Sequence, residues 1–203
     1  SLALAVLLLC VLRALVVSLD AGVRNSTSDR LIVQSAVSLF VNLPASYVSK
    51  LRAVEGVDSV ARLQWFGGYY QDPSSFFGQF GVDPEEFLGM YPEFKIVEGS
   101  RERFLTERTA CIVGRQTADR YGFKVGDTVP IIGTIFQRLD GLPWEFQVAG
   151  IYELESMVWD ETTIFFPFEY LEESLKGGAA SGPPGSGVIY IHLAEGVNPV
   201  DIA

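Results

Sequence analysis

The chain has 203 residues, of which 48% are hydrophobic, and its formal net charge is −10. A surface that binds nucleic-acid phosphates needs clustered Lys and Arg, and the densest basic group here, Arg101, Arg103 and Arg108, is interleaved with glutamates, so we exclude a nucleic-acid partner. The hydrophobic and aromatic content is that of a folded domain and argues against a disordered chain.

An almost continuous apolar run, LALAVLLLCVLRALVVSL, occupies residues 2–19. Eighteen helical residues span about 27 Å, which is close to the thickness of a bilayer core. The apolar residues cover every face, unlike the stripe of a soluble helix, and the basic start of a signal peptide is missing. We therefore predict an N-terminally truncated transmembrane helix over residues 1–23, with Arg13 near an interface.

A strand pattern, a helix pattern and a second strand pattern follow. Residues 31–41 are rich in Ile, Val, Leu and Phe, which is typical of a strand. Pro44 suits the first turn of a helix. The expected apolar stripe of that helix is Tyr47, Leu51 and Val54. Residues 57–65 return to a strand pattern, so we expect a βαβ or split βαβ unit.

The remaining chain alternates short helix and strand patterns. Helices are expected from Asp83-Pro84 to about Met90, before Gly122, and over residues 170–175. Strands are expected over residues 128–132, 144–152, 162–167 and 188–193. Residues 177–187 contain only Gly, Ala, Ser and Pro, which predicts a flexible loop. Asn198-Pro199 is a helix start, so we expect the segment to be cut at this end as well.

The stretch from Trp65 to Phe80 is unusually rich in aromatic residues. Such a run can form a surface for a partner or substrate, or it can pack a small β-rich lobe, because aromatic side chains bury a large area. The candidate surface residues are Trp65, Phe66, Tyr69, Tyr70, Phe76 and Phe77. Both interpretations stay open at this point.

Candidate catalytic chemistry is sparse. His192 is the only histidine, it lies in the apolar pattern VIYIHL, and no nucleophile-elbow motif accompanies it. Given the spacing of Cys10 and Cys111, we expect neither a disulfide between them nor a zinc site. The carboxylates around Glu153–Glu161 and Glu169–Glu173 lack a calcium-loop spacing and fit a solvated face. We therefore expect no catalytic, cofactor-binding or metal-binding residues.

The order of these parts resembles the extracytoplasmic (periplasmic) core domain of MacB/FtsX-type ABC transporter permeases. The most family-like blocks are V-G-R…A-x-x-Y-G-x-x-x-G-D within TACIVGRQTADRYGFKVGDTVPI (109–131) and F-x-V-x-G-I within WEFQVAGIYE (144–153). The other segments that carry the resemblance are LPASYVSKLRAVEGVDSV (43–60), WFGGYYQDPSSFFGQFGVDPEEFLGMYPEF (65–94) and TTIFFPFEYLEE (162–173). The resemblance covers nearly the whole chain, and its motifs are structural rather than catalytic.

The resemblance implies an α/β (α+β) fold with two lobes behind the membrane helix. A porter-like split βαβ lobe would be built from both ends of the domain, residues 29–66 and 187–203. An inserted β-rich lobe would comprise residues 67–186 and include the flexible loop.

The resemblance also implies a function without catalysis. Such a domain belongs to a permease subunit of the bacterial cytoplasmic (inner) membrane, faces the periplasm or the outside, and transmits ATPase-driven motion to a substrate or partner in efflux, lipoprotein release or related export. The implied partners are a separate cytoplasmic ATP-binding-cassette ATPase and a second permease copy, in a homodimer or heterodimer. No cofactor and no ATP site are implied for the domain itself.

Two other functions stay open on the sequence. A ligand-sensing domain of a membrane-anchored receptor would also follow one membrane helix, and a second membrane helix and a signalling module downstream would distinguish it from a permease. A membrane-anchored hydrolase would have to use Cys111 and His192, so its activity would be lost on His192→Ala.

Overall fold

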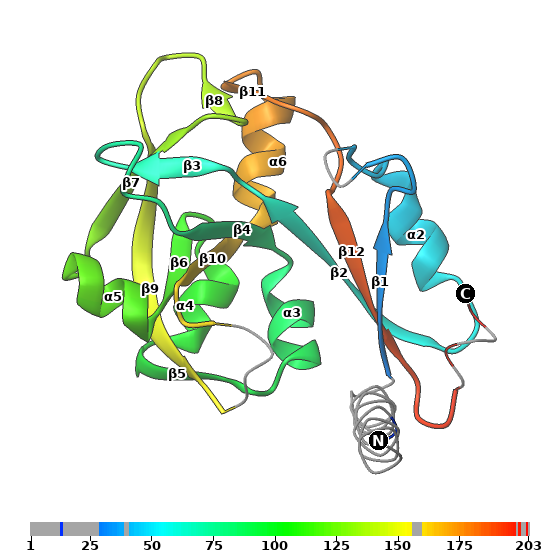
Figure 1. Cartoon of the computed structure of the whole chain (residues 1–203). Helices are drawn as coiled ribbons and strands as arrows, with labels where there is room; N and C mark the ends of the chain where they lie inside the picture. The colour runs from blue at the N-terminus through cyan, green and yellow to red at the C-terminus, as the bar shows by residue number, and fades with distance from the viewer. Residues whose placement is uncertain are drawn as a thin grey trace, which may run out of the picture.

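The structure is a computed structural model, and it describes residues 13, 29–38, 41–155, 160–197, 199 and 202 of the chain. Most of the strands in this part belong to one large mixed sheet. Ten strands form it, in the order β1-β12-β2-β4-β10-β6-β9-β7-β3 with β5 paired to β9, and five helices accompany it among the described residues (Figure 1). The expected α/β class is confirmed.

The predicted membrane helix over residues 1–23 lies outside the described residues, except for Arg13, which is helical and exposed. The described part of the chain contains no helix with the length and apolarity that a membrane crossing requires. The helix expected from Asn198-Pro199 lies outside the described residues apart from Pro199 and Ile202.

One end of the sheet is formed by three strands and one helix, which we call the three-stranded region. Its elements are β1 (Arg30–Gln34), α2 (Ser46–Arg52), β2 (Val57–Trp65) and β12 (Val188–Leu193). Strand β12 lies between β1 and β2 and is antiparallel to both, so β1 and β2 run parallel, as a split βαβ unit requires. The bounds of β2 and β12 coincide with the predicted strands.

The rest of the sheet and its helices form what we call the main body. Its elements are β3 (Gly68–Tyr70), β4 (Gly78–Val82), α3 (Pro84–Met90), β5 (Phe94–Gly99), α4 (Arg101–Thr106), β6 (Ala110–Gly114), α5 (Arg115–Tyr121), β7 (Thr128–Gly133), β8 (Gln137–Arg138), β9 (Trp144–Leu154), β10 (Thr163–Pro167), α6 (Phe168–Lys176) and β11 (Ala180–Ser181). The assignment of the two parts to a porter-like and an inserted lobe stays a prediction.

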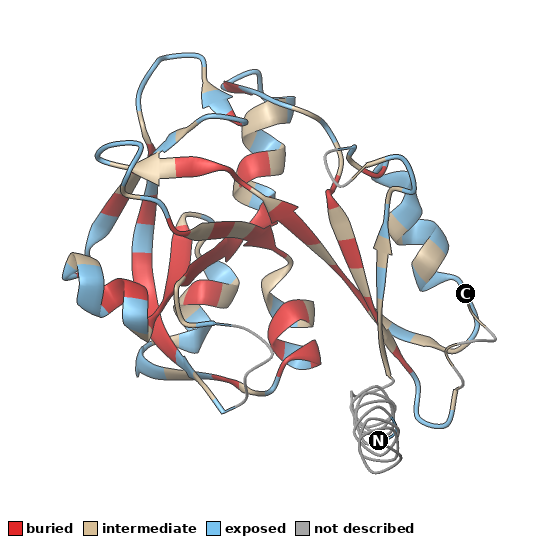
Figure 2. Cartoon of the chain, in the orientation of Figure 1, coloured by how far each residue is buried: buried red, intermediate tan, exposed pale blue. Residues whose placement is uncertain are grey.

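Both faces of the main-body sheet are buried (Figure 2). Successive residues of a strand point to opposite faces. Accordingly, Cys111 and Val113 of β6 belong to one core cluster with residues of α5 and α6, whereas Ala110 and Ile112 belong to another with residues of α3 and α4. This explains why β6 and β10 are continuous apolar runs without alternation.

The helix α2 differs from its expected orientation. Tyr47 and Val54, two members of the predicted stripe, are 40% and 39% exposed. Val48 and Leu51 pack instead against the small core cluster of the three-stranded region. The helix is only seven residues long, so the i, i+3 pair suffices to face the sheet, and a stripe extended to i+7 runs past its end.

The predicted loop 177–187 makes regular contacts with two parts of the fold. Ala180 and Ser181 form β11, which pairs with β8. Ser186 pairs with Leu43 through two backbone hydrogen bonds, of 2.7 and 3.0 Å. The flexibility of this segment stays a prediction.

Candidate functional site

His192 connects three strands at one end of the three-stranded region. It lies opposite Arg30, the first residue of β1. Its Nδ1 is 3.0 Å from Asp58 Oδ2, and its Nε2 is 3.3 Å from Asp29 Oδ2. Since Asp58 belongs to β2 and Asp29 precedes β1, the imidazole ties the start of β1, the end of β12 and the start of β2 together.

Cys111 is not a partner of His192 in this fold. Four strand-to-strand steps separate β12 from β6, which corresponds to about 19 Å along the sheet. Cys111 is fully buried, and burial raises the pKa of its thiol, which disfavours the nucleophilic thiolate. The pair needed for the hydrolase hypothesis is therefore not brought together.

Arg30 joins the three-stranded region to the main body. Its Nη1 donates to Glu93 Oε1 over 2.8 Å, and its guanidinium lies 4.6 Å from the centre of the Tyr91 ring. Tyr91 in turn meets Tyr190 of β12 edge to face, with 5.7 Å between the ring centres. These contacts connect β1 and β12 with the end of α3.

Arg62 makes a second connection, through Asp83, the residue before α3. The carboxylate of Asp83 caps no backbone N–H of α3. It accepts hydrogen bonds from the backbone N–H of Arg62 (2.8 Å) and from its Nη2 (2.6 Å), and Glu172 of α6 lies 3.4 Å from Nη1. Burial lowers the pKa of Arg62, but the hydrogen bond and charge of Asp83 outweigh this, so the pKa is raised.

Two of the six predicted surface residues belong to the interior. Phe66 is fully buried and Phe77 nearly so. The Phe66 ring stands edge-on to Trp144, Phe146 and Phe166, with ring centres 5.5 to 5.8 Å apart. These two phenylalanines therefore fill the core and do not contribute to a contact surface.

The other four residues are at least partly accessible. Tyr69 and Tyr70 are half-buried, and Tyr70 packs edge-on against Tyr121 at 5.6 Å. Phe76 is 49% exposed and lies 5.7 Å from the half-buried ring of Trp65. Phe76 lines a pocket of about 320 Å³, and Trp65 lines a larger one.

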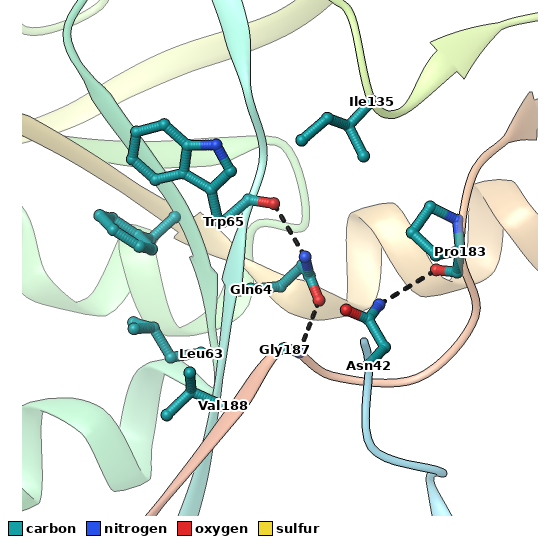
Figure 3. A pocket seen from close by; sticks show the side chains of 9 residues that line it. Asn42, Leu63, Gln64, Trp65, Ile135, Pro183, Gly187 and Val188 are labelled. Carbon is teal, nitrogen blue, oxygen red and sulfur yellow. Dashed lines mark hydrogen bonds between the residues drawn. The ribbon is translucent and has the colours of Figure 1, made fainter. Parts of the chain in front are cut away.

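That pocket has a volume of about 630 Å³ and lies where the three-stranded region meets the main body (Figure 3). Most of its lining is apolar. Its apolar side chains are those of Leu63 and Trp65 of β2, Phe80 of β4, Ile135 of the connection between β7 and β8, Pro183, and Val188 of β12.

The polar groups of the pocket wall bond to backbone (Figure 3). Gln64 Nε2 donates to the carbonyl of Trp65 (2.8 Å), and Gln64 Oε1 accepts from the N–H of Gly187 (2.7 Å). Asn42 Nδ2 donates to the carbonyl of Pro183 (3.3 Å). The two amides therefore hold three chain segments together at this point.

Sequence reasoning identified one of the nine lining residues, Trp65. One signal was available for another: Gln64 is a polar residue with 5% exposure inside the apolar end of a strand, and a buried amide there requires partners. Asn42, Ile135 and Pro183 carry no comparable sequence signal.

The acidic side chains that the sequence analysis singled out pair with arginines or with backbone N–H groups, and they do not form one cluster. Glu153 pairs with Arg115 (2.9 Å), Glu161 accepts from the N–H of Leu154 (3.0 Å), and Glu173 pairs with Arg108. Over residues 29–38, 41–155 and 160–197, no three His, Cys, Asp or Glu side chains are arranged to hold a metal.

The comparisons with known proteins agree on one kind of domain. The family model described as "MacB-like periplasmic core domain" matches residues 1–203. The comparison with curated proteins found no significant match.

Three solved structures share the fold at low identity. A domain of a putative permease from Porphyromonas gingivalis is 16% identical with a TM-score of 0.58, covering 86% of this chain and 79% of that one. The periplasmic region of MacB from Actinobacillus actinomycetemcomitans is 15% identical with a TM-score of 0.58, covering 87% and 79%. The extracellular domain of the noncanonic ABC-type transporter YknZ from Gram-positive bacteria is 14% identical with a TM-score of 0.54, covering 82% and 83%.

Proposed function

The chain belongs to the family of MacB-like periplasmic core domains found in ABC transporter permeases, and we propose from this premise that it transmits ATPase-driven motion to a substrate or partner outside the cytoplasmic membrane. The ATPase is a separate cytoplasmic subunit in this proposal, and the permease works as a dimer. The domain itself takes part as a mechanical element and not as an enzyme.

The pairing of β1 with β12 carries this proposal. In this proposal, β1 follows a membrane helix of the permease and β12 leads toward further ones. Arg30 at the start of β1 lies opposite His192 near the end of β12, and both ends lie in the same part of the molecule (Figure 1). A rearrangement of the membrane helices would therefore enter the domain through two adjacent, hydrogen-bonded strands.

Strand β2 supplies the route from there to the main body. Its residues 57–63 pair with β12, whereas residues 63–65 pair with β4. One strand is thus bonded to the three-stranded region along most of its length and to the main body at its end. A displacement of β12 would reach β4 through this shared strand without crossing a loop.

Two ion pairs near α3 connect the two parts, and the proposed motion would either break or preserve each of them. Arg30–Glu93 and Arg62–Asp83 both join the two parts and are largely shielded from solvent, with 13 to 20% of each side chain exposed. Charged hydrogen bonds of this kind are stronger and more directional than exposed ion pairs. We expect the pair at the moving edge, Arg30–Glu93, to change and the pair on the shared strand, Arg62–Asp83, to persist.

A distance measurement tests the proposal in the full-length permease reconstituted with its ATPase. Spin labels at Val37→Cys and Leu139→Cys, both strongly exposed, report on the three-stranded region and the main body. Cys10 is replaced by Ser, and burial shields Cys111 from labelling. We expect the mean distance between the labels to shift when ATP is trapped, because the two parts move relative to each other.

The matched control pair carries both labels on the main body, at Val125→Cys and Leu139→Cys, which are also exposed. Its distance should be the same with and without ATP. Unchanged distances for both pairs would contradict the proposal, and equal shifts for both would show deformation of the main body instead of transmission through it.

A further inference from the structure

We propose that the pocket between β2, β4 and residues 183–188 binds an uncharged, largely hydrocarbon small molecule. Its volume of about 630 Å³ lies within the range of roughly 300–1,000 Å³ that is typical of small-molecule sites. The inference goes beyond the proposed function, because such a site would bind its ligand whether or not the domain transmits motion.

The pocket originates where β12 separates from β2. The ladder between the two strands ends at the pair Val188–Leu63. Strand β2 continues for two residues beyond that pair, bonded to β4 on its other side. Beyond this pair β12 and β2 diverge and leave an opening in the sheet. At its edge, the side chain of Gln64 hydrogen-bonds to the N–H of Gly187 and to the carbonyl of Trp65, where a further backbone pair would otherwise form.

Strand register places four apolar side chains on one face of this opening. Val188 is opposite Leu63, and Phe80 is opposite Trp65. Opposite residues of antiparallel strands share a face, as do residues two apart in one strand. Leu63 and Trp65 are two apart, so all four side chains form a continuous apolar wall.

This wall is preformed by the core behind it. The rings of Trp65 and Phe80 meet edge to face with 5.1 Å between their centres, and Phe80 stacks on the fully buried Phe165 at 6.0 Å. On the other side, Ile135 is 37% exposed and sits close to Gly67, where an added Cβ would lie 2.5 Å from Ile135 Cδ1. A rigid wall faced by a half-exposed side chain is suited to an apolar ligand.

The polar chemistry of the lining excludes a charged ligand. None of the nine lining residues is charged, and both amide NH2 groups donate to backbone carbonyls. Burying a charge there would cost desolvation with nothing to offset it. The indole N–H of Trp65 has no acceptor within the described part of the chain, and its nitrogen lies on the ring side nearer Ile135 (Figure 3), so the ligand could present one hydrogen-bond acceptor.

Photolabelling in lipid nanodiscs tests the site on the whole chain. The probe is a diazirine-bearing octylphenyl ether, which is uncharged and has one acceptor oxygen. Labelled peptides are mapped by mass spectrometry, with unlabelled ether as competitor. We expect saturable labelling of the peptides that contain Leu63–Trp65, Phe80 and Val188, and weak labelling by the same scaffold carrying a carboxylate.

Two variants and one control decide the result. Ile135→Trp fills the pocket and should weaken saturable labelling by about tenfold or more, whereas Leu139→Trp, which adds the same ring at a residue 66% exposed, should not. Trp65→Phe keeps the wall and removes the N–H, so it should weaken labelling by the ether but not by an all-hydrocarbon analogue.

The proposal is overturned by any of three outcomes. Labelling that does not saturate, or that maps outside these peptides, would show membrane partitioning only. Labelling that Ile135→Trp leaves unchanged, in a variant whose circular dichroism matches the parent, would show that the probe binds elsewhere. Equal labelling by the carboxylate scaffold would contradict the chemistry assigned to the lining.

Discussion

The main body and the three-stranded region share one sheet, but helices cover it differently in the two parts (Figures 1 and 2). In the main body, helices pack on both faces of the sheet. In the three-stranded region, α2 packs on one face. Two core clusters stabilise the main body, and the second of them also includes Ala61 and Leu63 of β2. The cluster of the three-stranded region consists of three buried residues, Leu43, Val60 and Ile189, and α2 has no buried residue.

This difference in buried core suggests how one sheet combines a stiff part with a compliant one. Buried apolar area is the main source of stability in a fold, and regions with few buried contacts open at lower free energy. The three-stranded region should therefore yield first under load, while the main body keeps its shape and presents its surface. The proposed transmission of motion requires such a division of roles.

The largest effect should come from the core of the main body. Phe66→Ala removes a fully buried ring that contacts four other aromatic rings, so we expect a loss of about 3–5 kcal/mol in the free energy of unfolding. Urea unfolding followed by circular dichroism measures it. The control is Phe76→Ala, ten residues away and 49% exposed, which should cost less than about 1 kcal/mol; equal losses would break the comparison.

A smaller loss should follow when the shared strand is disconnected from α3. Asp83→Ala leaves the backbone N–H of Arg62 without its acceptor and leaves the guanidinium with Glu172 as its remaining partner, so we expect a loss of about 2–3 kcal/mol in unfolding free energy. Glu107→Ala removes an exposed i, i+4 partner of Arg103 and should cost only about 0.3–0.5 kcal/mol. If both variants unfold at the same urea concentration, the Arg62–Asp83 pair does not stabilise the fold more than an exposed ion pair does.

The next effect concerns the attachment of residues 177–187 to the three-stranded region. Gly185 has φ +90°, and an added Cβ would lie 2.2 Å from the carbonyl oxygen of Leu43. Gly185→Ala should therefore cost roughly 2 kcal/mol, from the left-handed backbone and the displacement of Leu43. Gly178→Ala meets no atom within 4 Å at φ +68° and should cost about 1 kcal/mol. Hydrogen exchange at Leu43 and Ser186 should accelerate in the first variant only, and acceleration in neither would contradict the attachment.

The smallest effect is a loss of stability at alkaline pH. Burial, and secondly the charge of Tyr190, raises the pKa of Tyr91 above its ordinary value of about 10. The folded state therefore keeps its proton where the unfolded state releases it, so this contribution is complete below about pH 10 and declines as pH rises, by at most about 1.4 kcal/mol per pH unit.

Unfolding free energies between pH 9 and 11 (a range set around the ordinary tyrosine value of about 10) test this sign. Tyr91→Phe should flatten the decline, whereas Tyr47→Phe, at an exposed position of α2, should follow the parent. A parent that becomes more stable over this range would contradict the prediction.

The three-stranded region was largely predictable because its signals are local. The strand patterns at residues 57–65 and 188–193 match β2 and β12 residue for residue, and Gly56, at φ +90°, lies just before β2. The order and pairing of the three strands were harder to predict from the sequence. Nothing local indicates that β12, more than 120 residues downstream of β2, inserts between β1 and β2, although the split βαβ alternative allowed it.

The main body was less predictable because its sheet is covered on both faces. β6 was not predicted as a strand, since a strand buried on both faces does not alternate, and α4 is a six-residue helix without a full apolar stripe. The pocket could not be predicted, because Asn42, Trp65, Ile135 and Pro183 come from four separate segments. Of the aromatic run, the sequence could not say which rings turn inward, and Phe66 and Phe77 do.

Hydrogen exchange of the whole chain, resolved by segment, tests the unequal stiffness most directly. We predict that the amides of α2 and β1 exchange through local opening, at much lower free energy than those of β6 and β9, which should exchange only on global unfolding. Exchange of all four elements at one common free energy would contradict the account, because the two parts would then form a single cooperative unit with no compliant end.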